Sequence, residues 1–174
     1  MDFLDIKEFI IDSIKLIFFI IVVLLIAIYV IGLQQIVGSS MKPTLNNQDI
    51  VLLDKLSYRF KNVKRGDIIS FYYADSKFLV KRVIGLPGES IEYVNGKLFV
   101  DGSKVDEPYL NNIVTEGFSF SKIPDDMFFV LGDNRSDSLD SRDEKVGLIQ
   151  KGDIIGKAVF RIWPLNKIGF MKKK

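Results

Sequence analysis

The chain has 174 residues, with 24 lysines and arginines against 22 aspartates and glutamates, and it contains neither histidine nor cysteine. These absences exclude a Ser-His triad, a thiol nucleophile, imidazole or thiolate metal sites and disulfides, so carboxylates, lysines and tyrosines are the available acids and bases. The net charge of +2 is too close to zero to favour nucleic acid as a partner.

The first predicted element is a membrane anchor. Residues 16–33, LIFFIIVVLLIAIYVIGL, carry no charge, and as a helix they would extend about 27 Å, close to the ~30 Å hydrocarbon core of a bilayer. Residues 1–15 are expected to form a helical segment at the membrane interface, because charged side chains recur there at helical spacing: Asp5, Glu8, Asp12 and Lys15.

A cleaved secretory signal peptide is the alternative interpretation of the same apolar run. The segment before the run is net acidic, however, and the run is longer than the apolar core of most signal peptides. We therefore interpret residues 16–33 as a retained anchor.

Residues 34–174 alternate short β-rich runs with turn signals, which predicts a mainly β domain of short antiparallel strands. In residues 89–102, Asn95-Gly96 stands between two β-rich arms and predicts a hairpin with a type I′ turn. Residues 102–125 have weaker periodicity and are expected to form a surface excursion. Further strands are expected at 48–57, 67–73, 78–86, 127–133 and 152–163.

The stretch VGSSMKPTL follows the anchor and places Ser40 between small residues and a proline-containing turn. A serine hydroxyl becomes a good nucleophile only when a neighbouring group accepts its proton. Without histidine the best remaining base is a lysine whose charged form is disfavoured by burial. Lys81 is the candidate because it lies in the apolar run FLVKRVIGL. From this pattern alone, an ordinary edge-strand lysine and a serine in a plain linker remain open.

The charged segment GDNRSDSLDSRDE is the third feature. An EF-hand loop is excluded, because Arg135 would occupy a ligand position and Ser138 would replace the turn glycine. Asp133 with Arg135, and Asp140 with Arg142, are two residues apart and could form ion pairs on one face of an extended segment. The pattern predicts a salt-bridged loop, with Ser138 between the two pairs.

Four segments follow one another in a fixed order along the chain. They are Ser40-Met41-Lys42-Pro43-Thr44-Leu45, Arg65-Gly66-Asp67-Ile68, Lys81-Arg82-Val83-Ile84-Gly85-Leu86-Pro87-Gly88, and Gly132 to Arg142. Together they resemble the sequence boxes of the type I signal peptidases. The resemblance extends over nearly the whole chain, and the short length with one anchor resembles the compact Gram-positive-type members.

The resemblance implies that Ser40 is the nucleophile and Lys81 the general base, and that the Ser138 hydroxyl orients the lysine amine. Some members of the family carry a serine two positions before the nucleophile, where it helps to bind the oxyanion. Gly38 stands at that position here, so a backbone N–H, chiefly that of Ser40, is expected to carry more of this task. The resemblance gives a supporting role to Asp133, Arg135, Asp140 and Arg142.

The family's substrate pocket is matched by residues that could equally be ordinary core: Ile36, Val37, Met41, Leu45, Leu79 and Val80. Such a lining favours small side chains one and three positions before the cut. The family needs no metal and no organic cofactor.

The resemblance implies a membrane-anchored serine endopeptidase that removes N-terminal signal peptides from secretory preproteins through an acyl-enzyme. It implies a cytoplasmic N-terminus, a β domain on the extracytoplasmic face of the cell membrane against the lipid bilayer, and proximity to the secretion translocase. Two alternatives remain open. One is a catalytically inactive, membrane-tethered binding module, and the other is a Ser-Lys peptidase that acts on itself or on a dedicated protein substrate.

Overall fold

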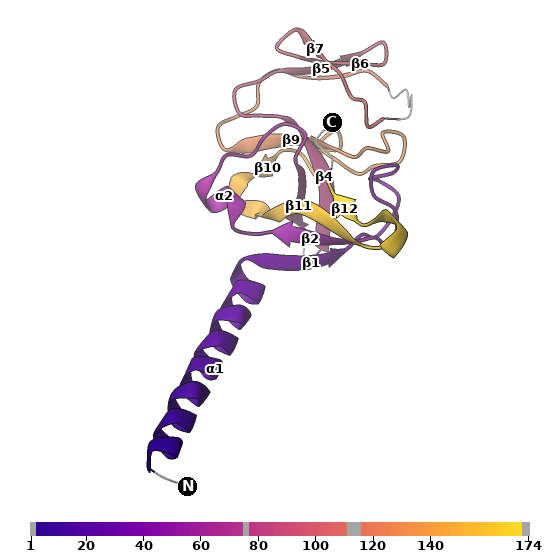
Figure 1. The fold of residues 1–174 in the computed structure, drawn as a ribbon. Helices are drawn as coiled ribbons and strands as arrows, with labels where there is room; N and C mark the ends of the chain where they lie inside the picture. Colours follow the sequence, from indigo (N-terminus) through magenta and orange to yellow (C-terminus); the bar gives the residue numbers. More distant parts are fainter. Residues whose placement is uncertain (1–2, 75–76, 111–115, 172–174) are drawn as a thin grey trace.

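A computed structural model describes residues 3–74, 77–110 and 116–171 of the protein. It is mainly β, with one long N-terminal helix, as the sequence predicts (Figure 1). The helices are α1 (Phe3–Tyr29) and α2 (Ser57–Phe60), with single 3-10 turns at η1 (Lys151–Asp153) and η2 (Leu165–Lys167). The strands are β1 (Ile31–Gln35), β2 (Ile50–Asp54), β3 (Ile68–Tyr73), β4 (Lys77–Gly85), β5 (Ile91–Val94), β6 (Lys97–Val100), β7 (Ser103–Val105), β8 (Phe118–Phe120), β9 (Met127–Leu131), β10 (Ile149–Gln150), β11 (Ile154–Trp163) and β12 (Gly169–Phe170).

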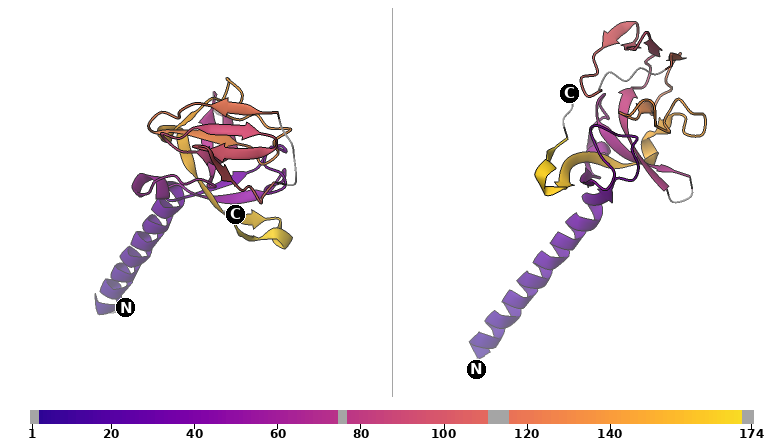
Figure 2. Two further views of the ribbon diagram at one scale, coloured as in Figure 1. Left: turned by 90° about the horizontal axis from the view of Figure 1, so that it is seen from above. Right: turned by 90° about the vertical axis from the view of Figure 1, so that its right-hand side faces the viewer.

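Helix α1 projects away from the β domain as a single rod (Figures 1 and 2). Its stretch from Ile6 to Tyr29 is long and apolar enough to cross a membrane, and none of it is buried against the domain. Exposing so many large apolar side chains to water is unfavourable by roughly 25 cal/mol for each Å². A bilayer removes this cost, so the helix is suited to serve as a membrane anchor.

The helix ends earlier than the apolar run does. The Val30 carbonyl accepts a hydrogen bond from the Lys55 backbone N–H at 2.9 Å, and the Lys55 ammonium donates to the Ile28 carbonyl at 3.2 Å. These contacts satisfy carbonyls that lack partners at a helix C-terminus. From Ile31 onward the backbone pairs with β2 instead, so the predicted anchor 16–33 differs from the structure at its end.

The described strands form two antiparallel sheets. The larger has the order β1-β2-β11-β3-β4-β9-β10, with β12 paired to β11, and the smaller has the order β7-β6-β5-β8. The smaller sheet lies at the end of the domain away from α1 (Figure 1). Asn95 and Gly96 have φ angles of 50° and 74° between β5 and β6, which confirms the predicted type I′ hairpin.

The described part of residues 102–125 differs from the predicted surface excursion. It contains β7 and β8, which complete the smaller sheet on both sides of the β5–β6 hairpin. Ile123 is fully buried in the core between the sheets. Strands of three residues are too short to show a clear period, so the sequence pattern missed them.

Candidate active site

Strand β4 positions Lys81 in the interior of the larger sheet. Its side chain is 2% exposed, and its cross-strand neighbour on β3 is Ile69. Leu79 and Val83 flank it on the same face of the strand, since side chains alternate along a strand. Burial lowers the pKa of Lys81 to about 8, although the carboxylates of Asp140 and Asp133 act in the opposite direction.

Ser40 lies in the turn that follows β1, and its hydroxyl meets the buried amine. The Lys81 Nζ lies 2.6 Å from the Ser40 Oγ. The loop between β1 and β2 is closed at its base, where the Ile36 N–H donates to the Asp49 carbonyl and the Gln48 N–H donates to the Ile36 carbonyl, both at 2.8 Å. The structure therefore brings together two residues that only resemblance had linked.

A second segment holds the serine turn in place. The backbone N–H of Asn134 donates to the Ser40 carbonyl at 2.9 Å, and its side-chain amide donates to the Ser39 carbonyl at 3.3 Å. The Ser39 hydroxyl donates to Asp137. Sequence reasoning did not single out these three residues, although Asn134 lies inside a box that it quoted.

Gly132 permits this close approach. A Cβ at this position would lie 2.1 Å from the Ser138 Oγ and 2.5 Å from the Ser40 carbonyl oxygen. Because both distances are far below van der Waals contact, any larger residue would push the two serines apart.

Ser138 lies close to the Asp140 carboxylate. Its hydroxyl is buried, and within the described residues it makes no well-formed hydrogen bond, either to Lys81 or to another group. The expected hydrogen bond that would orient the lysine amine is thus not formed in this structure.

Asp140 and Arg142 form the predicted ion pair. The Arg142 Nε and Nη2 donate to the two carboxylate oxygens at 2.8 and 2.9 Å, and the Gly132 N–H donates at 2.9 Å. Burial alone would raise the pKa of the Asp140 carboxyl, but these hydrogen bonds hold it below its ordinary value. The pair therefore remains charged and fixes the backbone of Gly132.

Asp133 and Arg135 do not pair with each other. Asp133 instead accepts hydrogen bonds from Arg82 at 2.8 and 2.7 Å, and Arg135 forms an ion pair with Glu107. The predicted pairing assumed an extended segment, whereas residues 133–137 form bends and turns. In this bend the side chains of Asp133 and Arg135 are directed to different partners.

The buried Arg82 connects these elements. Its guanidinium forms a two-point ion pair with Asp133, donates to the Gly66 carbonyl at 3.0 Å and lies 3.9 Å from the ring centre of Tyr109. Asp133 also accepts a hydrogen bond from the Thr44 hydroxyl at 2.5 Å. Arg82 follows Lys81 directly in the sequence, but nothing in the pattern marked it as a structural centre of the site.

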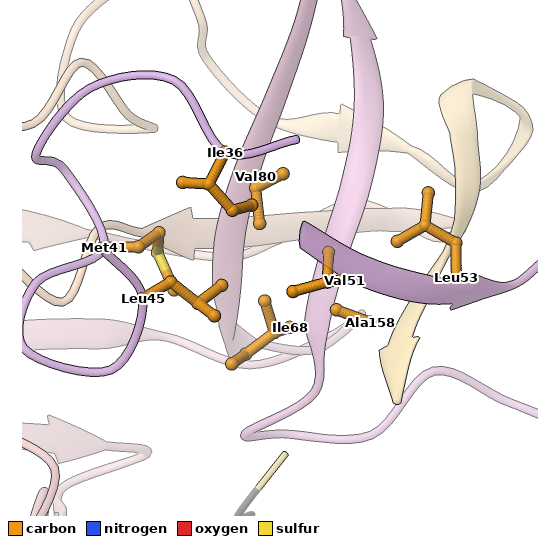
Figure 3. Close-up of a cluster of buried hydrophobic side chains, with 8 residues drawn as sticks. All are labelled: Ile36, Met41, Leu45, Val51, Leu53, Ile68, Val80 and Ala158. Atoms are coloured by element: carbon orange, nitrogen blue, oxygen red, sulfur yellow. The ribbon is translucent and has the colours of Figure 1, made fainter. Parts of the chain in front are cut away.

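The six residues expected to line a substrate pocket separate into three environments. Four of them are buried in one apolar cluster with residues of β2, β3 and β11 (Figure 3): Ile36, Met41, Leu45 and Val80. Leu79 is partly buried and packs against a different cluster. Val37, three residues before Ser40, is 86% exposed. Only Val37 and Leu79 therefore offer appreciable side-chain surface to a ligand.

The backbone N–H groups of Gly38 and Ser40 are the two donors that the sequence pointed to for an oxyanion. Gly38 has a φ of +94°, which favours glycine, and its N–H donates to the Asn47 side chain at 2.9 Å. In the part of the chain that the structure describes, the Ser40 N–H is paired with no acceptor. The Ser40 N–H is therefore the better candidate of the two for binding an oxyanion.

Comparison with known proteins extends these observations. The family described as signal peptidase, peptidase S26, matches residues 10–163. Signal peptidase I of Bacillus caldolyticus is 39% identical over 163 residues, which are 86% of this chain and 88% of the relative. Signal peptidase I S of Bacillus subtilis (strain 168) is 36% identical over 160 residues, 86% of each chain. The crystal structure of a signal peptidase I from Enterococcus faecalis V583 is 34% identical, with a TM-score of 0.51, and the match covers 56% of this chain and 97% of that one.

Proposed function

The chain belongs to the signal peptidase family, peptidase S26, and we propose that it removes signal peptides by Ser-Lys chemistry, with Ser40 as nucleophile and Lys81 as general base. Membership makes the protein a serine peptidase that acts on secretory preproteins. The observation that carries the proposed chemistry is the 2.6 Å approach of the Lys81 Nζ to the Ser40 Oγ. Such a contact fits the geometry that proton transfer requires.

Lys81 is suited to act as a base because its environment disfavours the charged form. A pKa of about 8 leaves a usable fraction of neutral amine near neutral pH, whereas a lysine in water leaves almost none. Substrate that covers the site would exclude further water and strengthen this effect.

In the proposed acylation step the Ser40 Oγ attacks the carbonyl carbon of the scissile bond while its proton passes to the Lys81 Nζ. The oxyanion that forms is stabilised by the Ser40 N–H. When the tetrahedral intermediate collapses, the Lys81 ammonium gives its proton to the leaving amine, and the mature protein departs. In deacylation Lys81 takes a proton from a water molecule as its oxygen attacks the ester carbonyl. The bond between the acyl group and the Ser40 Oγ then breaks, the signal peptide leaves with a new C-terminal carboxyl group, and the Lys81 ammonium returns its proton to the Ser40 Oγ.

The remaining site residues are proposed to support this pair without taking part in the chemistry. The Asp140–Arg142 pair holds the backbone of Gly132 beside Ser40, and the Ser138 hydroxyl lies over the same glycine. Asp133 accepts a hydrogen bond from Thr44, which lies in the loop between β1 and β2 that carries Ser40, here called the serine loop. Arg135 donates to the Gly132 carbonyl at 3.1 Å.

The substrate is proposed to lie extended beside Val37 and Leu79, with its backbone hydrogen bonded to strand edges. The four buried residues of the apolar cluster in Figure 3 would shape this surface from beneath. We expect such a surface to accept small side chains one and three positions before the cut.

The proposed topology places the N-terminus in the cytoplasm and the β domain on the extracytoplasmic face, close to the secretion translocase. Only one residue separates α1 from β1, so the domain must lie near the bilayer surface that α1 leaves. A preprotein whose apolar segment spans the same bilayer would present its cleavage site at this level.

The test is cleavage of a preprotein by the full chain in detergent. Wild-type protein should release the mature product, whereas Ser40→Ala and Lys81→Ala should not, with unchanged circular dichroism. Lys81→Arg should also fail, because a guanidinium does not give up its proton at usable pH, and Lys97→Arg on the exposed hairpin is the matched control. Cleavage by Lys81→Arg at the wild-type rate would remove Lys81 from the role of base. Binding without cleavage by the wild type would favour the inactive module, and shortening of the chain itself would favour self-processing.

A further inference from the structure

A pocket of about 540 Å³ lies between the serine loop and the C-terminal hairpin, which we define as Trp163–Met171. It is separate from the Ser40–Lys81 contact, since neither residue lines it. Its walls are formed by Thr44, Arg82, Pro108, Tyr109, Arg161, Lys167, Ile168, Gly169, Phe170 and Met171.

The polar part of this pocket is cationic. Three of its lining residues, Arg82, Arg161 and Lys167, carry positive charge, and no carboxylate is among the described lining residues. Acids that contact the lining residues are already paired with arginines. Asp133 pairs with Arg82, and Asp49 lies 3.2 Å from Arg161. Glu107, which accepts a hydrogen bond from the Tyr109 hydroxyl, pairs with Arg135. In the described part of the chain, Lys167 forms no salt bridge.

Arg161 also has a buried donor that is not satisfied by protein. Its Nε is inaccessible and has no acceptor among the described residues, whereas its Nη2 donates to the Thr44 carbonyl at 2.6 Å. A buried donor without an acceptor is unfavourable, so a small shift of the guanidinium that brings this N–H to an oxygen-rich anion in the pocket would be favoured. A phosphate group offers several acceptors and suits arginine geometry.

The other part of the pocket is apolar and open. Phe170 is 79% exposed, and Ile168 is also exposed beside it. On the same hairpin, Trp163 and Leu165 present further exposed apolar surface. A ligand that fits both parts has an anionic head and an apolar body.

With α1 embedded in a bilayer, the pocket would lie close to the bilayer surface. Across the larger sheet, Gln34 of β1 neighbours Val51, Val51 neighbours Arg161, and Arg161 neighbours Gly169 of β12. Three strand spacings of ~4.8 Å put β12 about 14 Å from β1, and β1 follows the anchor helix directly. Figure 1 shows the C-terminal hairpin beside β1 and β2, on the side of the domain from which α1 extends.

We propose that this pocket binds the phosphate headgroup of an anionic phospholipid, with Arg161 and Lys167 holding the phosphate and with Ile168 and Phe170 against the upper acyl chain. The site does not depend on the chemistry proposed for Ser40. It nevertheless contacts the serine loop, because Arg161 binds the Thr44 carbonyl and Thr44 binds Asp133.

Trp163 provides the probe, since it is the single tryptophan of the chain and lies on the hairpin. The full chain in uncharged detergent micelles would be titrated with dihexanoylphosphatidylglycerol, with dihexanoylphosphatidylcholine and with inorganic phosphate, and Trp163 emission recorded. We expect a saturable change with phosphatidylglycerol at a concentration at least tenfold below that needed for either other compound. The response should weaken as salt is added, because exposed charges are screened.

Lys167→Gln should weaken the phosphatidylglycerol response at least threefold, with the melting temperature in the absence of lipid unchanged. Lys97→Gln, an equal loss of charge at the far end of the domain, should leave the response as in wild type. Equal weakening by both variants would mean a general charge effect and would overturn the site. An equal response to phosphatidylcholine would overturn the role of the anionic head, and an equal response to inorganic phosphate would overturn the lipid as the ligand.

Discussion

Replacing Lys81 by methionine should stabilise the domain at neutral pH. Methionine keeps much of the volume of the lysine side chain but removes a charge from a site that is 2% exposed. The pKa of Lys81 falls from 10.5 to about 8 on folding, and a difference of roughly 2.5 pH units at 1.36 kcal/mol each corresponds to about 3 kcal/mol. This is the free energy by which the buried charge disfavours the native state while the amine is protonated.

The stability difference between Lys81→Met and wild type should depend on pH. Below pH 8 both states of the wild type hold the proton, so the native state carries the full cost. Between about pH 8 and 10.5 the unfolded chain binds the proton and the native protein does not, so wild-type stability rises with pH. The advantage of Lys81→Met should therefore be constant below pH 8 and should fall by about 3 kcal/mol as pH approaches 10.5.

The assay is thermal unfolding of both proteins in uncharged detergent at a series of pH values. At about 2–4 °C for each kcal/mol in a domain of this size, the variant should melt several degrees higher at pH 7. Lys97→Met is the control, because the exposed Lys97 side chain stays in water when the domain folds, and its difference from wild type should not vary with pH. If Lys81→Met melts lower than wild type at pH 7, or if its difference is constant to pH 10.5, the amine does not carry the desolvation cost inferred here.

Three further predictions concern the support of the site and the topology. Gly132→Ala should reduce turnover by roughly 10²-fold in an activity assay and destabilise the domain by about 1–3 kcal/mol in a melt, because the added Cβ would clash with Ser138 and Ser40. Gly152→Ala is the control: it has open space around it and should change neither quantity. Asp140→Asn should first lower stability, by about 3 kcal/mol through the broken pair with Arg142, and an unchanged melt with lost turnover would contradict the supporting role. Protease added to intact spheroplasts should degrade the β domain and spare the N-terminus, and protection of the domain would reverse the proposed orientation.

The sequence predicted the parts of the fold that have local signals. Alternation and turn residues located β2, β3, β4, β9 and β11, and Asn95-Gly96 located the hairpin. The Asp140–Arg142 pair was also predicted from its spacing, whereas the same spacing failed for Asp133 and Arg135.

The remaining contacts depend on the tertiary fold. Asp133 pairs with Arg82, 51 residues away, and Arg135 pairs with Glu107 from a segment whose weak periodicity suggested a surface loop. The end of α1 is set by Lys55, which contacts Ile28 only because β2 lies beside the end of the helix. Spacing along the chain carries no information on such partners, so only the resemblance linked Ser40 with Lys81.

The pH dependence of kcat/KM for preprotein cleavage tests the proposed mechanism most directly. The free enzyme needs a neutral Lys81, so kcat/KM should rise about tenfold for each pH unit below an apparent pKa of about 8 and level off above it. The measurement should use a preprotein with no titratable group near its cleavage site, within the pH range in which the fold is retained. The chain has no histidine whose titration could produce such a rise in kcat/KM. A profile that is flat from about pH 5 to 9, or one that rises only near the pKa of about 10.4 of a lysine in water, would show that Lys81 is not the buried base.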